Sequence, residues 1–264
     1  ATYNITVTPH LAASTSEAQT RAAVDVAEQV NQILQGSVPE FPVNIDTVDT
    51  DTMLTLAPFL EPIRLAGSIA SQLAVGTSTS GNIQSAHINY LGNFTGLETH
   101  PLRSSAIIGI LGSATTIPVN IVNALNIAES TGLSVQEKFS KSIEPYENLV
   151  QITVITDQRS EKVSATSTSA GVEIVSIGQW NINFRPASKI LLLVENLDQP
   201  GEVGRVGQIM GDLGVNISSM AVAPGLTTDD PALMVIGISR SLDQSEALQI
   251  SELTGISRVR QVTL

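Results

Sequence analysis

Hydrophobic residues between positions 189 and 264 recur with two different spacings. Short apolar runs at 189–196, 215–223, 232–239 and 258–264 have the length of β-strands. Two other segments, 202–213 and 244–253, carry apolar residues at helical spacing; Pro200 precedes the first of them and Gly214 ends it. The predicted order is strand, helix, strand, strand, helix, strand. This order is typical of a ferredoxin-like α+β fold, a four-stranded antiparallel sheet with both helices on one face.

The first turn of this predicted domain has groups that suit a free amino acid. The amides that open a helix after Gly201 form an anion site for a carboxylate. Asp198 is suited to the ammonium group, and Asn196 and Asn216 can each donate and accept hydrogen bonds. We expect the three side chains to meet at one edge of the sheet. The alternative is that these are ordinary turn residues, because turns and ligand sites use the same residue types.

Two motifs here resemble the ACT domain of the D-3-phosphoglycerate dehydrogenase family. They are Leu193-Val-Glu-Asn-Leu-Asp-Gln-Pro-Gly-Glu-Val-Gly-Arg-Val-Gly207 and Gly214-Val-Asn-Ile-Ser-Ser-Met220. In that family the ACT domain binds L-serine, a feedback inhibitor, at an interface between two ACT domains. The resemblance therefore implies serine contacts from Asn196, Asp198 and Asn216, and a homodimer or larger assembly.

The other end of the chain resembles the same family. Asn4-Ile-Thr-Val-Thr-Pro-His-Leu-Ala-Ala-Ser-Thr-Ser-Glu-Ala-Gln19 is similar to the loop that carries the catalytic histidine of these NAD-dependent enzymes, so the resemblance makes His10 the acid/base residue of a parent enzyme. No Gly-x-Gly-x-x-Gly motif follows a strand, and we expect the nicotinamide-binding Rossmann domain to be absent. The resemblance thus implies the C-terminal portion of such an enzyme, inactive alone, with no cofactor of its own.

Residues 1–46 are predicted to be the tail of the catalytic region, with a capping box at Ser14–Glu17, a helix over 15–34 and an extended linker at 38–44. Residues 47–186 are predicted to be a mixed α/β domain, and 187–264 the ACT domain. The middle pattern predicts helices at 54–73, 102–113 and 119–130, and strands at 86–91, 134–139, 149–156, 162–166, 173–177 and 180–184.

This middle segment resembles the intervening, allosteric substrate-binding domain of longer members of the family. The resemblance rests on Pro118-Val-Asn-Ile-Val-Asn-Ala124, Tyr146-Glu-Asn-Leu-Val150 and Gly171-Val-Glu-Ile-Val-Ser-Ile-Gly178. Some members bind a phosphorylated acid there, which makes Arg185, Lys162 and Lys189 a possible anion site. The alternative, that these are scattered surface cations, stays open because Gln179 and Trp180 replace the histidine expected before the last strand.

Composition narrows the function classes. A net charge of −12 argues against binding to nucleic acid or to anionic membranes. The chain has no cysteine, which excludes disulfides and thiol catalysis and agrees with a cytoplasmic location. Neither His87 nor His100 is followed or preceded in the sequence by a second His, Cys or carboxylate at metal-ligand spacing, so we expect no metal. Two further hypotheses remain: a stand-alone amino-acid-binding ACT module, and a degenerate module that only oligomerises.

Overall fold

The computed structural model describes residues 7, 9, 11, 13–34, 48–76, 82–141, 144–227 and 230–264. The chain divides into two compact units, Ala1–Thr47 and Val48–Leu264. The first contains helix α1 (Ser16–Leu34). The Thr15 hydroxyl accepts a hydrogen bond from the Ala18 amide at 3.2 Å. Thr15 is therefore the N-cap of α1, one residue later than the predicted capping box places it. The predicted linker at 38–44 lies outside the described residues.

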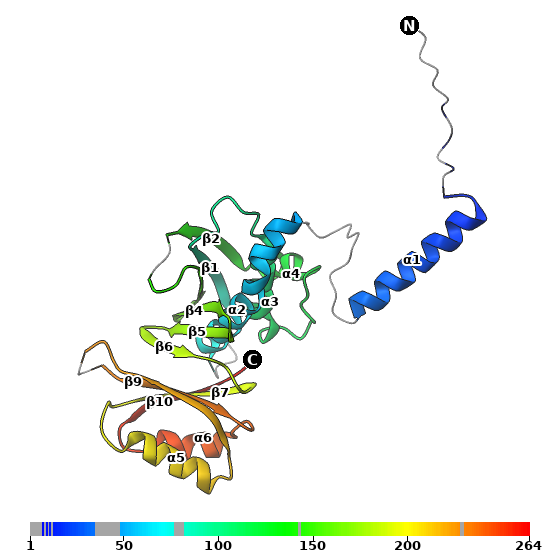
Figure 1. Cartoon of the computed structure of the whole chain (residues 1–264). Coiled ribbons are helices and arrows are strands. Elements are labelled where there is room, and N and C mark those ends of the chain that lie inside the picture. The colour runs from blue at the N-terminus through cyan, green and yellow to red at the C-terminus, as the bar shows by residue number, and fades with distance from the viewer. Residues whose placement is uncertain are drawn as a thin grey trace. The chain divides into compact units, whose positions relative to one another are not determined.

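The second unit begins with a mixed six-stranded sheet (Figure 1). Its strands lie side by side in the order β2-β1-β3-β4-β5-β6, and within the sheet only β1 and β2 pair in parallel. The bounds are β1 (Ile83–Leu91), β2 (Ser134–Ser140), β3 (Leu149–Thr156), β4 (Ser160–Thr168), β5 (Gly171–Ile177) and β6 (Trp180–Phe184). All six predicted strands of the middle segment are present.

Helix α2 (Thr50–Val75) covers this sheet and packs against α3 (His100–Gly112). It begins four residues earlier than predicted because the Asp49 carboxylate accepts a hydrogen bond from the Thr52 amide at 3.0 Å and caps the helix. The two helices lie close together at Gly109, where a Cβ would be 2.0 Å from the Arg64 carbonyl oxygen. The crossing thus requires a residue without a side chain.

Helix α4 (Ala124–Ser130) is shorter than the helix predicted over 119–130. The Asn120 side chain accepts hydrogen bonds from the amides of Val122 (2.9 Å) and Asn123 (3.1 Å), which fold the preceding residues into turns. This is the competition between side chain and helix backbone that asparagine commonly introduces.

The remaining elements form a four-stranded antiparallel sheet in the order β10-β7-β9-β8. Along the chain they are β7 (Ile190–Asn196), α5 (Glu202–Asp212), β8 (Ile217–Ala223), β9 (Ala232–Ile238), α6 (Gln244–Ser251) and β10 (Ile256–Thr263). The predicted βαββαβ order is confirmed. Both helices lie on one face of the sheet (Figure 1), where Val206, Met210 and Ile250 pack against Leu192 and Val194.

The opposite face of the four-stranded sheet is also covered. Leu191, Leu193 and Val235 belong to the same hydrophobic cluster as the core of the six-stranded sheet. Strand β6 lies against β8 and β9, and the Trp180 indole N–H donates to the Pro231 carbonyl oxygen at 2.7 Å. Trp180, the first residue of β6, therefore packs against the four-stranded sheet. Burial on both faces explains why β7 and β9 are apolar without alternation.

Candidate functional site

The turn between β7 and α5 is one candidate site, because it ends at the start of a helix. Asn196 is the last residue of β7 and is buried. Its side-chain amide nitrogen donates to the backbone carbonyl oxygens of Val194 at 3.3 Å and Ala232 at 3.4 Å. Asp198 is exposed, and its carboxylate has no hydrogen-bond partner among the described residues. Gly201 is the N-cap of α5 with φ 102°, a conformation that favours glycine. The Glu202 amide donates to the Gln199 carbonyl at 3.4 Å, whereas the amides of Val203 and Gly204 have no hydrogen-bond partner among the described residues, so an exposed carboxylate and two unpaired helix amides lie within one turn.

A buried acid lies beneath this turn. Glu202 is 2% exposed and forms an ion pair with Arg205, while its Oε2 atom is buried without a partner in the described part of the chain. The turn before β10 covers it: a Cβ at Gly255 would lie 2.6 Å from Glu202 Oε1, and the Gly255 carbonyl accepts the Leu197 amide at 2.7 Å. A carboxylate at this helix N-terminus is electrostatically favourable. The two turns hold each other in place.

The expectation that Asn196, Asp198 and Asn216 meet at one edge of the sheet is wrong within a single chain. Asn216 precedes Ile217, which pairs with Ile238, and Ile238 pairs with Ile190 at the beginning of β7. Asn196 lies at the other end of β7. Six residues of strand separate the two ends, about 20 Å along the strand direction. The prediction did not take into account that β8 pairs with β9 and not with β7. In this register the first residue of β8 lies at the end of the sheet opposite to the turn between β7 and α5.

The strand pairings of the two sheets do not place the three cations of the predicted anion site next to one another. Arg185 follows β6, and its Nε lies 3.3 Å from a carboxylate oxygen of Glu173. Lys162 is near the beginning of β4, where its neighbour Val163 pairs with Ile177. Lys189 precedes β7 and is exposed. No hydrogen bond or ion pair within the described part of the chain joins any two of them, and Arg185 already has an acidic partner. Their role as an anion site stays a prediction.

His10 lies outside the described residues, so its predicted role stays a prediction. Within the ranges that the structure describes, no group of three or more His, Cys, Asp or Glu side chains is arranged to hold a metal ion, and no helix is both long and apolar enough to cross a membrane.

The glycine-rich segment of the described residues does not have the pattern that binds a nicotinamide dinucleotide. Their glycine-rich strand–turn–helix segment is β7 to α5, with glycines at 201, 204 and 207. It leads from one antiparallel strand to another, and three-residue glycine spacing is not the dinucleotide pattern.

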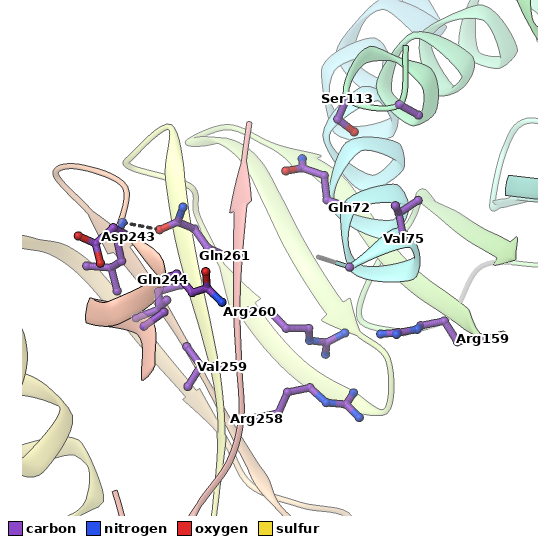
Figure 2. Close-up of a pocket in the computed structure, with 15 residues that line it drawn as sticks. Gln72, Val75, Ser113, Arg159, Asp243, Gln244, Arg258, Val259, Arg260 and Gln261 are labelled. Atoms are coloured by element: carbon purple, nitrogen blue, oxygen red, sulfur yellow. Dashed lines mark hydrogen bonds between the residues drawn. The ribbon is translucent and has the colours of Figure 1, made fainter. Parts of the chain in front are cut away.

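A second candidate site, which the sequence analysis missed, is an open groove of about 880 Å³ beside β10. It is lined by the end of α2, the turn between β3 and β4, the start of α6, and β10 itself. Figure 2 shows the guanidinium groups of Arg159 and Arg260 pointing toward one another, with that of Arg258 beside them. A signal for it existed: residues at 258 and 260 of a strand point to the same face.

Two amide side chains and one acid complete the groove. The Gln72 amide bridges the end of β10: its nitrogen donates to the Thr263 carbonyl at 2.7 Å, and its oxygen accepts the Thr263 amide at 2.8 Å. Gln261 accepts the Leu242 amide at 2.8 Å. The Glu246 amide and the Ser245 hydroxyl donate to Asp243, which lowers the pKa of this carboxyl. Asp243 is thus committed to capping α6.

Comparison with known proteins matches the chain to one family. The sequence profile described as the D-3-phosphoglycerate dehydrogenase intervening domain matches residues 55–178. The D-3-phosphoglycerate dehydrogenase of Bacillus subtilis is 31% identical over 261 residues, which are 98% of this chain and 48% of the relative. The D-3-phosphoglycerate dehydrogenase of Methanocaldococcus jannaschii is 28% identical over 99% of this chain and 48% of the relative. That of Synechocystis is 31% identical over 99% of this chain and 46% of the relative.

The chain spans about half the length of the curated relatives it matches. The profile covers α2 to β5, and the relatives extend the similarity over almost the whole chain. The family recognised from the two ends of the sequence is thereby confirmed. The chain belongs to the D-3-phosphoglycerate dehydrogenase family.

Proposed function

We propose that this chain is the regulatory part of an NAD-dependent D-3-phosphoglycerate dehydrogenase, and that it binds L-serine as feedback inhibitor between two copies of its ACT domain. In the parent enzyme His10 would move the hydroxyl proton during oxidation of 3-phospho-D-glycerate. The relatives' name supports the parent activity. The observation that carries the serine proposal is the turn from β7 to α5, which offers the exposed carboxylate of Asp198 beside the unpaired amides of Val203 and Gly204.

The distance between the two halves of the proposed site supports the need for a second copy. Asn196 and Asp198 lie at one end of the four-stranded sheet, and Asn216 lies at the other. If two copies pair along β8 about a two-fold axis, their β8 strands run antiparallel. The partner's Asn216 then comes to the end at which Asn196 lies. Each of two equivalent sites would use Asp198 from one chain and Asn216 from the other.

Strand β8 is suited to such pairing. It is at the end of the strand order and has no neighbour on its outer side among the described strands. Its sequence, Ile-Ser-Ser-Met-Ala-Val-Ala, has no charge and no proline, the residues that commonly protect an edge strand. Val222 on it is 45% exposed. Pairing would give a continuous eight-stranded sheet.

The test is a complementation experiment by titration calorimetry with L-serine. Asp198→Ala and Asn216→Ala should each abolish binding, whereas Asp25→Ala, an acid-to-alanine change on α1, should leave it intact. In a mixed dimer of the two inactive variants, one site carries both substitutions and the other carries neither. Mixing should therefore restore serine binding to about half of the mixed dimers' sites.

Three outcomes would contradict the proposal. If mixing restores nothing although sedimentation shows mixed dimers, the site does not combine residues of two chains. If Asp198→Ala binds serine normally, the turn is not the site. If the wild-type chain dimerises without binding serine, the pairing of β8 serves assembly alone, as the oligomerisation hypothesis holds.

A further inference from the structure

The groove beside β10 concentrates positive charge in a chain whose net charge is −12. Three arginines reach it from two different sheets: Arg159 from the turn between β3 and β4, and Arg258 and Arg260 from β10. In Figure 2 the guanidinium groups of Arg159 and Arg260 face each other across the groove. Two facing cations repel, and an anion between them would relieve this repulsion.

The carboxylates that pair with these arginines do not line the groove. Arg260 contacts Glu161 at 2.6 Å and Glu195 at 2.9 Å, and Arg258 lies 3.6 Å from Glu195. The negative charges of these two carboxylates thus compensate the positive charges of two arginines. Arg159 forms no ion pair within the described residues, so the cluster keeps one uncompensated positive charge.

One further group of the groove, a nitrogen atom of Arg260, agrees with an anionic ligand. The Nε atom of Arg260 is buried and has no hydrogen-bond partner in the described part of the protein. The acidic lining residue Asp243 is occupied by the Glu246 amide and the Ser245 hydroxyl. Helix α6 begins at Gln244, and the Asp243 carboxylate already caps its N-terminus, so the helix adds no free positive end to the groove. The C-terminal end of α2 lies near Arg159, whose Nη1 would be 3.5 Å from a Cβ at Gly76.

We propose that this groove binds the phosphate group of a small molecule through Arg159, Arg258 and Arg260. Guanidinium groups bind phosphate oxygens in a bidentate manner, and a tetrahedral phosphate offers oxygens in several directions, whereas a carboxylate offers two in one plane. The site differs from the one that the sequence predicted at Arg185, Lys162 and Lys189, and it does not depend on serine binding.

Such a ligand would join the two sheets of the second unit. Arg159 belongs to the six-stranded sheet and Arg258 to the four-stranded one, so the phosphate contacts both. Since it binds only when both sheets are in place, it stabilises the folded unit by mass action. Phosphate should raise the unfolding temperature in a saturable manner.

The experiment titrates the full chain with inorganic phosphate at constant ionic strength and follows heat and unfolding temperature. Arg159→Gln should weaken binding at least about tenfold, because the guanidinium without a carboxylate partner is lost. Arg258→Gln, an exposed position, should weaken it to a similar extent. Arg21→Gln on α1 removes the same charge at a residue that does not line the groove and should change nothing, and Arg185→Gln should also bind normally.

Three small ligands separate the sources of the phosphate. Equal binding of phosphate and 3-phospho-D-glycerate identifies the phosphate group alone as the ligand, whereas much tighter or exclusive binding of the ester identifies a phosphorylated acid. D-glycerate should not bind; if it binds as well as the ester, the site recognises carboxylate and the phosphate proposal is wrong. The proposal is also overturned if neither phosphate compound binds, if Arg185→Gln abolishes binding, or if Arg159→Gln and Arg21→Gln behave alike.

Discussion

The contact between α2 and α3 at Gly109 gives a quantitative prediction. In Gly109→Ala the new Cβ would lie 2.0 Å from the Arg64 carbonyl oxygen and 2.9 Å from its carbonyl carbon. An ordinary carbon–oxygen contact requires a shift of about 1 to 1.5 Å. The obstacle is helix backbone, which cannot rotate away, so the helices must separate.

The size of the effect follows from two opposing terms. Alanine is favoured over glycine in a helix by about 1 kcal/mol. Overpacking costs about 1–3 kcal/mol and more where backbone must move, and it also loosens the buried neighbours Ile107 and Ile110. We expect a net loss of about 2 kcal/mol or more in the free energy of unfolding. For a unit of this size that is a fall of about 4–8 °C in the unfolding temperature.

Gly112→Ala is the matched control on the same helix. No atom lies within 4 Å of a Cβ at this position, and Gly112 is exposed at the end of α3. Only the propensity term remains, so this variant should be unchanged or more stable by up to about 1 kcal/mol. Both variants are compared by urea unfolding followed by circular dichroism. If they differ by less than about 0.5 kcal/mol, the close approach of the helices does not limit stability and the reasoning fails.

Three further predictions concern the groove and its surroundings. Gln72→Ala removes both hydrogen bonds to Thr263 and should cost about 1–2 kcal/mol, with faster hydrogen exchange of the Thr263 amide as the direct readout. Arg260→Met leaves the largely buried carboxylate of Glu161 without an ion-pair partner and Glu195 with Arg258 alone, at 3.6 Å, and should cost about 3 kcal/mol, whereas the exposed Arg258→Met should cost less than about 1 kcal/mol. Urea unfolding at pH 7 separates the two. Hydrogen bonds from the Glu246 amide and the Ser245 hydroxyl lower the pKa of Asp243 below the ordinary carboxyl value of 3.8. The cap therefore stabilises α6 above pH 3.8, and this stabilisation is lost as the pH falls through the lower pKa of the folded state. Asp243→Asn should remove this part of the acid sensitivity, which is measured by hydrogen exchange of the α6 amides between pH 5 and 2.

Strand positions were predictable because burial on both faces leaves continuous apolar runs. Residues Leu191–Val194 have no polar interruption, and the strand they predicted is β7. Helix ends were less predictable, because single side chains decide them. Asp49 extends α2 toward the N-terminus, and Asn120 delays the start of α4. Neither of these side-chain hydrogen bonds can be predicted from the spacing of hydrophobic residues.

The candidate sites show a different limit. Asp198 and Gly201 were identified correctly as turn residues because turn formation is local. The separation of Asn196 from Asn216 depends on which strand β8 pairs with and in which register, and this is decided by long-range packing. The groove likewise combines Arg159 with a strand about a hundred residues later, through ion pairs such as that of Arg260 with Glu161. Distances of this kind are set only when the whole unit has folded.

The hydrophobic cluster shared by the two sheets has a consequence for how this protein is divided and recombined. A chain cut at residue 186 would leave Leu191, Leu193 and Val235 facing water on one side of the four-stranded sheet and would remove the indole bond to Pro231 on the other piece. Each exposed leucine forfeits about 1.5–3 kcal/mol of burial. A gene fusion that contains only residues 187–264 should therefore aggregate. A fusion that begins at residue 48 also contains the six-stranded sheet that covers this face, and it should remain monodisperse or pair only along β8.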